Sequence, residues 1–457
     1  MGITSAFFAA TSGINATSRA LSEIGNNIAN AQTIGYKSRS VSFGDLFGAT
    51  IGGGGTSTAL VEGRGVRVLG IDPSFTQGSL QTTSNALDLA IDGDGFFRVS
   101  DATGNIFYSR AGQFDVDSQG NLVNPAGLRL QGDQADDTGL LSGTVGNISL
   151  TTSTQPGRLT SEIAMSGRLA ANAPINAYTI AQVLDPQSNK GLFPGNAPVR
   201  VFDSQGVGHD LQIYFAKTAA NVWEYSVLAQ EGEIDLSTLP AANVDTNTHN
   251  ALVADGTLTY TDEGFLNLES TVNYYNTAGS GLGGGIDFLG KAPNQPIAFD
   301  FGTSITEGGA GTNGLLQQGT SLNNNALVLD TLSQDGFGPG SLAGTSIGED
   351  GIITGRFDNG TTRTLGQVRL TRFINPDGLQ PIGRNLFIQS GDSGTPLDGV
   401  PGTGAFGKVS ASTLEASNVD LGEELVNMIT MQRGFQANSR IITTTNDLLG
   451  ELVNLAR

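Results

Sequence analysis

Residues 3–31 read ITSAFFAATSGINATSRALSEIGNNIANA, and apolar side chains recur in this stretch at alternating steps of four and three residues. A repeat that averages 3.5 residues allows two helices to stay in contact along their length. The residues of this predicted seam that we expect to act in assembly are Ile3, Phe7, Ile14, Leu21, Ile24 and Ile28. The helix is expected to end between Asn30 and Gly35, because Asn and Gly tolerate left-handed backbone angles.

A second helix with the same spacing is predicted at the other end of the chain, within residues 421–456. One apolar row has members seven residues apart, and a companion row turns polar in its middle. The predicted seam of this helix comprises Leu421, Leu425, Met428, Gln432, Phe435, Ser439, Ile442, Asn446 and Leu449. Asp420, followed by Glu423, has the pattern of a helix start, and Ser417 or Asn418 is an alternative cap.

The polar members of the second seam, Gln432, Ser439 and Asn446, help to separate two interpretations. In one, each terminal helix is an ordinary amphipathic helix packed on a globular core. In the other, the two helices form a coiled coil that takes part in assembly. Polar groups are costly in a monomer's core, whereas a polar seam residue can fix the register between helices. We therefore predict a coiled coil used for assembly.

Between the helices, short apolar runs alternate with turn residues. Glycine is abundant, with 65 residues, and only 14% of the residues are charged, which is typical of a folded β-rich chain. Asp-Gly pairs and related turn signals predict hairpins at Leu87–Val99, Phe107–Val123, Val201–Phe215, Glu349–Gly351 and Phe357–Gly360. Long surface loops are expected near residues 276–285 and 302–345, where Gly, Asn and Ser dominate.

The predicted fold class is therefore mainly β with terminal α-helices, with nested β domains carried on an N-/C-terminal α-helical coiled coil. The simplest arrangement is nested, because chain termini are often close together in space. Residues 1–35 and 415–457 form the coiled-coil core domain in this prediction, and residues 36–74, with the Gly-rich run 48–58, form an extended linker. The first β domain is discontinuous. It takes residues 75–160 and 346–414, and residues 161–345 form an inserted outer β domain that is possibly subdivided.

The composition excludes several classes of function. The net charge of −20 argues against nucleic-acid binding, which needs a basic surface, and it also disfavours binding to an anionic membrane. Cysteine is absent from the sequence, so we expect no disulfide and no thiolate metal site. No apolar run is long enough to predict membrane insertion. The first residues have no basic cluster ahead of their apolar patch, so we expect no cleavable secretory signal.

No enzymatic site is predicted. Asp92–Gly95 and Asp115–Gly120 are similar to the opening of a calcium loop, but neither has a Glu at the final ligand position, and tight turns explain them better. His209 and His249 have no partner at metal or triad spacing, and His209 is expected to be exposed. Scattered Asp and Glu leave a two-carboxylate glycosidase pair open, with no residue that favours it. We therefore expect no catalytic residues, no metal and no cofactor.

Residues 22–37, SEIGNNIANAQTIGYK, closely resemble the N-terminal signature shared by flagellar rod and hook proteins. Residues 85–97 and 108–114 resemble two further motifs of this family, and residues 417–429 and 432–438 are similar to its C-terminal signature. The signature positions in this chain are Asn26, Asn27, Asn30, Gly35, Tyr36, Asn427, Gln432 and Arg433.

Three features favour the hook branch of this family over the rod branch. The chain is much longer than the rod proteins, which resemble it at their ends. Residues 201–224 resemble the start of the domain that is inserted in hook proteins, and residues 350–385 resemble the segment that returns from it. Residues 225–345 show no such resemblance.

The resemblance implies a structural subunit of the bacterial flagellar hook. Such a subunit forms a homopolymer, a flexible curved tube that acts as a universal joint and transmits torque from rod to filament. The resemblance also implies an extracellular location in the flagellum, type III export without a cleavable signal peptide, a hook cap during assembly, and contact with rod and hook–filament junction proteins. Two alternatives stay open at this point: a distal flagellar rod subunit, and a secreted β-rich adhesin with a coiled-coil stalk.

Overall fold

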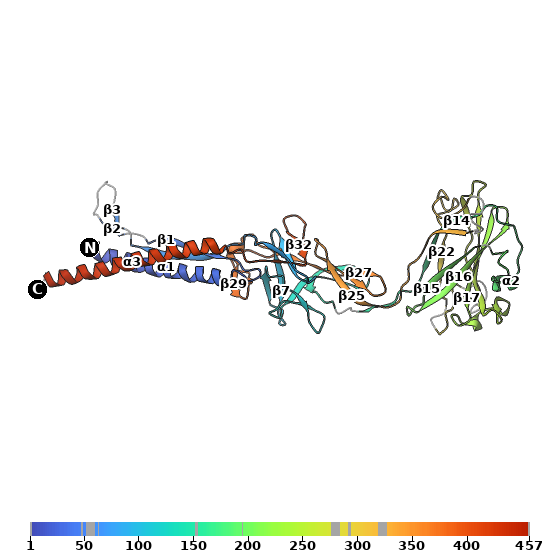
Figure 1. The fold of residues 1–457 in the computed structure, drawn as a ribbon, viewed down its shortest axis with the longest axis horizontal. Helices are drawn as coiled ribbons and strands as arrows, with labels where there is room; N and C mark the ends of the chain where they lie inside the picture. Colours follow the sequence, from blue (N-terminus) through green and yellow to red (C-terminus); the bar gives the residue numbers. More distant parts are fainter. Residues whose placement is uncertain are drawn as a thin grey trace. The chain divides into compact units, whose positions relative to one another are not determined.

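The chain folds into two compact units, one inserted in the other (Figure 1). The computed structural model describes residues 2–46, 49–51, 60–62, 64–150, 154–193, 195–275, 284–290, 294–318 and 327–455. The first unit consists of Met1–Ser153, Ala343–Arg356 and Thr362–Arg457, and the second of Thr154–Leu342 and Phe357–Thr361. The expected limits of the inserted domain, residues 161 and 345, fall near the limits of the second unit. The finer division into four parts stays a prediction.

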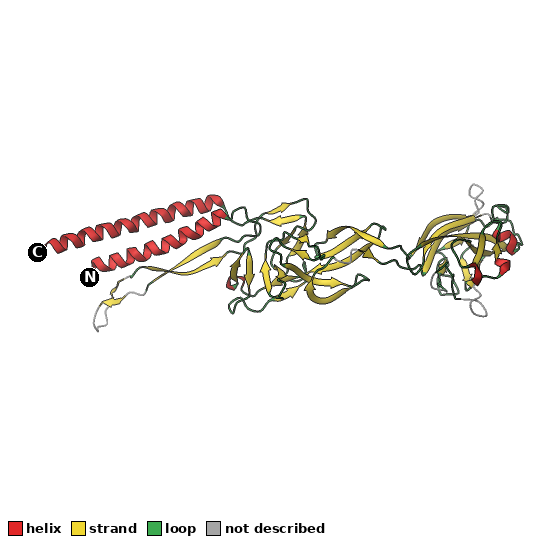
Figure 2. Ribbon diagram, turned by 90° about the horizontal axis from the view of Figure 1, so that it is seen from below, coloured by secondary structure: helices red, strands yellow, loops and turns green. Residues whose placement is uncertain are grey.

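The first unit begins and ends with a long helix, and Figure 2 shows the two helices side by side. Helix α1 is Gly2–Ala29 and helix α3 is Leu421–Leu455. Helix α1 ends where the sequence predicts, and the chain then turns through Gly35 at a φ of 67°. Helix α3 begins after Asp420, whose carboxylate accepts hydrogen bonds from the backbone N–H groups of Gly422 (2.7 Å) and Glu423 (3.2 Å). The predicted fold class, mainly β with terminal helices, is confirmed.

A β-hairpin follows α1 in the region where an extended Gly-rich linker is expected. Strands β1 (Arg39–Asp45) and β4 (Val66–Pro73) pair antiparallel, and both contact α1. Between them, the short strands β2 (Ala49–Ile51) and β3 (Leu60–Glu62) also pair. The structure differs from the expectation because apolar and polar residues alternate in β1 and β4, a strand pattern that the neighbouring glycines obscured. Of the Gly-rich run 48–58, only residues 49–51 are described.

The remainder of the first unit is a β domain with an aromatic core. Its sheet has the strand order β26-β27-β11-β7-β8-β30-β29, with short strands added at its sides. Phe96, Tyr108, Phe373 and Phe387 form its centre, packed mostly edge to face, as in the Phe96–Phe373 pair at 6.1 Å. The elements are β5 (Leu80–Thr82), β6 (Leu89–Asp92), β7 (Phe96–Ser100), β8 (Ile106–Ser109), β9 (Asp115–Val116), β10 (Leu122–Val123), β11 (Arg129–Ala135), β12 (Leu141–Asn147), β26 (Ile352–Phe357), β27 (Thr362–Val368), β28 (Leu370–Arg372), η3 (Pro376–Gly378), β29 (Gln380–Gly383), β30 (Leu386–Ile388), β31 (Leu397–Gly399), β32 (Lys408–Ala411) and β33 (Thr413–Glu415).

Most predicted hairpins are present, but the one at Leu87–Val99 is wrong. Strands β9 and β10 pair across the turn that follows Val116, and β26 pairs with β27 across Phe357–Gly360. At Leu87–Val99 both strands exist, yet β6 pairs with β32 and β7 pairs with β8, β11 and β28. The Asp-Gly turn, with Gly93 at a φ of 106°, instead transfers the chain from one sheet to another.

The second unit packs two sheets around a main apolar core, and a smaller apolar cluster in the same unit includes Val183 and Leu184. The larger sheet has the order β15-β16-β17-β19-β18, and β14 is paired with β22, β23 and β24 in the smaller one. Trp223, Tyr225 and Phe215 are fully buried between them. The elements are β13 (Thr154–Gln155), β14 (Glu162–Leu169), α2 (Ile180–Leu184), β15 (Gly195–Phe202), β16 (Gly208–Ala219), β17 (Val222–Gln230), η1 (Leu236–Thr238), η2 (Ala241–Asn243), β18 (Val244–Asp245), β19 (Asn250–Tyr260), β20 (Leu266–Glu269), β21 (Asn273–Tyr274), β22 (Ala298–Asp300), β23 (Leu315–Gln317), β24 (Leu327–Gln334) and β25 (Gly340–Ile347), which continues into the first unit.

Two further expectations about this region need correction. The expected long loop at residues 302–345 contains β23, β24 and the start of β25, because its apolar residues pair with neighbouring strands. The other expected loop, residues 276–285, lies mostly outside the described residues. His209 is buried rather than exposed. Its ring stacks on Phe288 at 4.3 Å and contacts the carboxylates of Glu233 (2.6 Å) and Asp203 (3.2 Å).

Candidate assembly surface

Helix α1 carries a stripe of small buried residues, and one of them, Gly13, lies close to α3. On α1 the buried stripe contains Ala10, Gly13, Ala16 and Ala20, three or four residues apart. A Cβ on Gly13 would lie 2.6 Å from the side-chain nitrogen of Asn438 on α3. The two helices therefore approach closely at Gly13, because this residue has no side chain. They run in opposite directions, since the N-terminal part of α1 contacts the C-terminal part of α3.

The predicted seam residues lie mainly beside this stripe. On α1, Ile24 is buried, and Phe7, Ile14, Leu21 and Ile28 are half-buried. The side chain of Ile3 lies outside the described residues. On α3, three seam residues are half-buried and the others are exposed. The half-buried ones are Met428, Ser439 and Ile442, and the exposed ones are Leu421, Leu425, Gln432, Phe435, Asn446 and Leu449. Their role in assembly stays a prediction.

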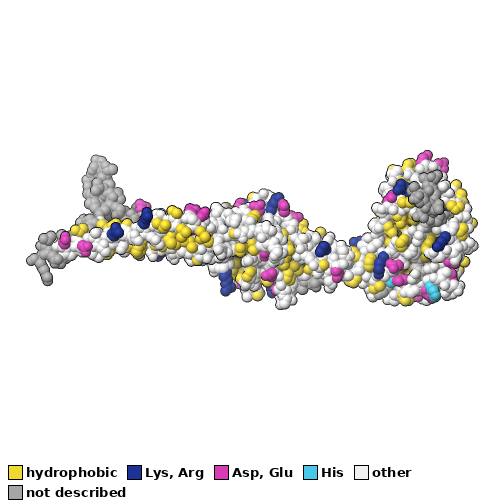
Figure 3. Space-filling view, viewed as in Figure 1, with side chains coloured by type: hydrophobic (Ala, Val, Ile, Leu, Met, Phe, Trp, Pro, Cys, Tyr) yellow, Lys and Arg dark blue, Asp and Glu magenta, His cyan; other side chains and the backbone are white. Residues whose placement is uncertain are grey.

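Helix α3 exposes many large apolar side chains, and we call these residues the exposed apolar set of α3. The set comprises Leu421, Leu425, Val426, Ile429, Phe435, Ile441, Leu448 and Leu449. Val426 is 62% exposed and Leu425 is 51% exposed. Figure 3 shows apolar side chains gathered along the helical part of the first unit. Large apolar side chains left exposed along the whole length of one helix favour a role in protein–protein contact.

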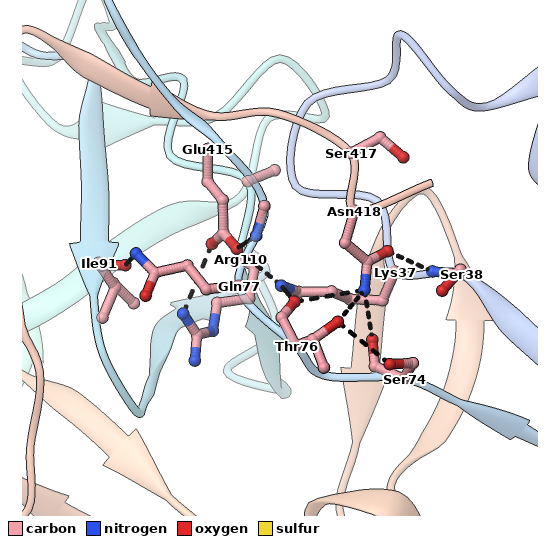
Figure 4. A network of polar contacts seen from close by, with 12 residues as sticks. Lys37, Ser38, Ser74, Thr76, Gln77, Ile91, Arg110, Glu415, Ser417 and Asn418 are labelled. Carbon is pink, nitrogen blue, oxygen red and sulfur yellow. Dashed lines mark hydrogen bonds and ion pairs between the residues drawn. The ribbon is translucent and has the colours of Figure 1, made fainter. Parts of the chain in front are cut away.

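A buried charge network lies where the helices join the β domain (Figure 4). The Lys37 ammonium donates to the carboxylate of Glu415 (2.7 Å) and to the carbonyl of Thr76 (2.7 Å), and Arg110 lies 3.5 Å from the same carboxylate. The backbone N–H of Gly78 also donates to Glu415 (2.9 Å). Burial lowers the pKa of Lys37 from its usual value, while the Glu415 carboxylate opposes that shift. We call Lys37, Arg110 and Glu415 the junction network.

Asn418 continues this network along the C-terminal segment. Its side chain accepts a hydrogen bond from the N–H of Ser38 (2.7 Å) and donates to the carbonyl of Ser74 (2.9 Å). The residue is therefore a bridge between segments, although the sequence offered it as a helix cap. The junction network had no local sequence signal, because Lys37 and Glu415 are separated by nearly the whole chain. Lys37 does lie at the end of the N-terminal signature motif.

The family-signature residues divide between this junction and the surface of α3. The buried amide of Asn27 accepts from Tyr36 (3.2 Å) and from the N–H of Arg39 (3.0 Å), and it donates to Glu424 of α3 (2.8 Å). Gly35 donates to the carbonyl of Glu415 (2.8 Å), and a Cβ there would meet the backbone of residue 111 at 2.5 Å. At the C-terminal end of α1, the side chain of Asn30 donates to the carbonyl of Asn26 (2.9 Å). By contrast, Asn427, Gln432 and Arg433 are exposed on α3.

No group of three or more His, Asp or Glu side chains in the described part of the chain is arranged to hold a metal ion. No helix among the described residues is long and apolar enough to cross a membrane.

Four family models match the chain. They are "Flagella basal body rod protein" at residues 8–37, "Flagellar hook protein FlgE/F/G D1 domain" at 90–168, "Flagellar basal body protein FlaE D2 domain" at 172–337, and "Flagellar basal body rod FlgEFG protein C-terminal" at 410–455. The flagellar hook protein FlgE of Escherichia coli K12 is 36% identical, over 98% of this chain and 100% of the relative. FlgE of Borreliella burgdorferi is 33% identical, over 98% of both. A crystal structure of Helicobacter pylori FlgE2 is similar at 14% identity with a TM-score of 0.47, covering 74% of this chain and 100% of that one.

These matches confirm the resemblance seen in the sequence and do not favour the distal rod or adhesin alternatives. The relatives named as hook proteins align over nearly the full chain, including the second unit. The chain therefore belongs to the flagellar hook protein FlgE family and is a structural subunit of the bacterial flagellar hook.

Proposed function

We propose that the chain polymerises with copies of itself, through α1 and α3, into the flexible curved tube that transmits torque from rod to filament. The observation that carries this proposal is the exposed apolar set of α3. Each Leu, Ile or Phe of this set contributes about 1–3 kcal/mol when a neighbouring copy buries it. A head-to-tail contact that does not close on itself gives a helical array, which is the geometry of a tube.

In this proposal, the predicted seam residues are the contacts between copies. Phe7, Ile14 and Leu21 of α1 and Phe435 and Leu449 of α3 keep part of their apolar surface accessible in the single chain. The small residues between α1 and α3 hold each helix pair together. The seam residues beside them remain available to a neighbour, so one helix pair can serve as the repeating element of a tube wall.

Flexibility would come from the second unit. Its large aromatic side chains, such as Trp223, are used inside its own core. We propose that the contacts between neighbouring second units are polar and can slide, while the helices keep the lattice. A large apolar interface between second units would contradict this.

The proposed partners follow from the family. They are further copies of the chain, rod and hook–filament junction proteins, and a cap during growth. The proposed location is the extracellular hook, reached by type III export without a cleavable signal. No catalytic or cofactor role is proposed. Secretion of the chain by cells with and without a working flagellar export apparatus tests the route, and secretion without the apparatus would refute it.

Assembly of the purified full chain, followed by electron microscopy, tests the main proposal. The natural sequence should form curved tubes. The double variant Leu425→Ser/Ile429→Ser should remain folded by circular dichroism and form few or no tubes, because both side chains are about half exposed in the single chain. The matched control is Leu140→Ser/Ile374→Ser, at exposed apolar positions of the β domain. It should assemble normally. Normal tubes from the α3 variant would refute the role of the exposed apolar set.

A further inference from the structure

A groove of about 580 Å³ lies between α1 and the β1–β4 hairpin of the first unit. It is lined by Ser12, Asn15, Arg19, Val66, Arg67 and Val68, among others. The hairpin is held against the helix at one end of the groove, where the N–H of Val66 donates to the hydroxyl of Ser12 (3.1 Å). Gly65 makes this approach possible, because at its φ of 100° a Cβ would lie 2.0 Å from that hydroxyl. The groove is therefore a consequence of specific local packing.

The charged side chains that line the groove are basic. Arg19 comes from the helix and Arg67 from the strand, and both side chains are exposed. Neither arginine forms an ion pair with another described residue of the chain. In a protein with a net charge of −20, two unpaired arginines in one groove are notable. Such a groove favours a partner that presents carboxylates at a similar spacing.

The C-terminal part of α3 carries carboxylates of this kind. Asp447 and Glu451 are both exposed and stand four residues apart, so they lie on the same face of the helix. Like charges at this spacing repel each other, and Glu451, near the C-terminal end of α3, also opposes the helix dipole. Neither residue forms an ion pair with the described part of its own chain. These carboxylates therefore destabilise the isolated helix and would gain from a basic partner.

The groove and the acidic end of α3 cannot meet within one chain. Thr17, two residues from Arg19, contacts α3 at Gly434. At 1.5 Å per residue, the helix rises by about 20–26 Å from Gly434 to Asp447 and Glu451. From Asn438, which faces Gly13 at the other end of the groove, the rise to the same two residues is about 14–20 Å. The acidic end thus lies beyond the reach of its own groove. A second copy, displaced along the helix axis by a similar distance, brings the two together.

We propose that Asp447 and Glu451 of one copy dock in the groove lined by Arg19 and Arg67 of another copy, and that this contact sets the axial offset between neighbours. The inference rests on the proposed polymerisation and adds to it a specific electrostatic contact. Because the charges are partly exposed, the contact is screened by salt. It complements the apolar set of α3, which gives adhesion without fixing the axial position.

Charge reversal in the full chain tests the contact. Arg19→Glu/Arg67→Glu and Asp447→Arg/Glu451→Arg should each lower the rate of tube formation at low salt at least tenfold. The second variant should also raise the helix content of the monomer, because it removes carboxylates from the helix C-terminus. The chain that combines all four substitutions should recover assembly, since every copy then carries the reversed pair. No recovery, or normal assembly of either double variant, would overturn the proposal.

Cross-linking gives a second readout, made simple by the absence of cysteine. In assembled Arg67→Cys/Glu451→Cys protein, mild oxidation should give a ladder of covalent multimers on a denaturing gel, and dilute monomer should give none. The control Arg67→Cys/Glu423→Cys places the second thiol at the opposite end of α3 and should give no ladder. An equal ladder from the control would overturn the assigned contact. If the natural chain formed no tubes at all, the proposed function would fail first, so the two failures are distinguishable.

Discussion

The core of the second unit and the helix pair of the first unit use apolar residues in opposite ways. In the second unit, Trp223, Tyr225 and Phe215 are fully buried by their own chain. In the helix pair, the helices approach closely at Gly13, and large side chains such as Leu425 and Phe435 are exposed. The second unit thus completes its hydrophobic burial alone. The helices leave theirs incomplete, which is the arrangement expected of an element that is finished only by neighbouring copies.

The junction network lies within the first unit, between the helix pair and the β domain. It is buried like a core, but its contacts are ionic and join segments from both ends of the first unit. A buried ion pair is a weak source of net stability, yet removing one partner is costly. The network therefore specifies one arrangement of the chain where the helix pair joins the β domain.

The largest expected effect on stability comes from creating a cavity in the core of the second unit. Trp223→Ala should lower the free energy of unfolding of the second unit by about 3–5 kcal/mol, because it leaves a cavity where a fully buried side chain stood. Calorimetry should show a lower transition temperature for one unit and an almost unchanged transition for the other. Ile374→Ala, at a residue that is 79% exposed, is the control and should change little. Loss of the helical signal together with the second unit would contradict the independence of the two regions.

Removing the central carboxylate of the junction should have the next largest effect. Glu415→Gln leaves Lys37 and Arg110 buried without a counter-charge and should cost about 3 kcal/mol, measured by denaturant unfolding of the first unit. Glu349→Gln is the matched control, since its pair with Lys408 is largely exposed. It should leave the free energy of unfolding almost unchanged, because an exposed ion pair is screened by solvent. Equal losses in the two variants would show that the junction has no special role.

Local patterns in the sequence were sufficient for part of this architecture. The seven-residue spacing predicted both helices, and Asp420 was recognised as a cap, because these features depend on neighbours along the chain. The pairing at Leu87–Val99 was wrong because the choice of partner strand depends on distant segments such as β32. The burial of His209 was missed for the same reason, since Phe288 and Glu233 come from other parts of the second unit.

The candidate assembly surface, too, could be predicted only in part from the sequence. The heptad pattern predicted both helices, but they approach each other closely at Gly13, which is not in the predicted seam. Small residues give no strong periodic signal, so close helix packing is hard to see in a sequence. The ion pair between Lys37 and Glu415 could not be predicted from the sequence either, because only the folded chain brings these two residues together.

A smaller effect is expected from the pH dependence of the second unit. Burial, reinforced by the charges of Asp300 and Glu307, raises the pKa of Glu269 from its usual value of 4.5 to about 8. The folded state therefore holds a proton that the unfolded state releases, so stability falls as the pH rises from about 4.5 to about 8 and changes little above that. Glu269→Gln should lose this dependence and be about 2 kcal/mol more stable than the natural chain at pH 9, allowing for its partial exposure.

Urea unfolding at pH 5 and pH 9 measures this difference. The exposed Glu263 gives the control Glu263→Gln, which should keep the pH dependence of the natural chain. If Glu269→Gln kept it too, the burial of this carboxyl would not be its source. The helix pair should show no comparable dependence, which sharpens the contrast between a region that buries polar groups and one that presents its surface to neighbours.

Changes in the polar seam residues of α3 should have the smallest effect on the stability of the single chain. They test most directly whether the helices have a role that appears only in the polymer. Gln432 and Asn446 are exposed, so Gln432→Leu/Asn446→Leu should change the free energy of unfolding by less than about 0.5 kcal/mol. In the polymer the same substitutions remove the polar groups that fix register, while the apolar set remains. Tubes should therefore still form, but with variable diameter or curvature under the electron microscope. The control Gln436→Leu alters an exposed position of α3 outside the predicted seam and should give regular tubes. Regular tubes from the double variant would remove the register role of the polar row and leave register to other contacts, such as the proposed docking of Asp447 and Glu451.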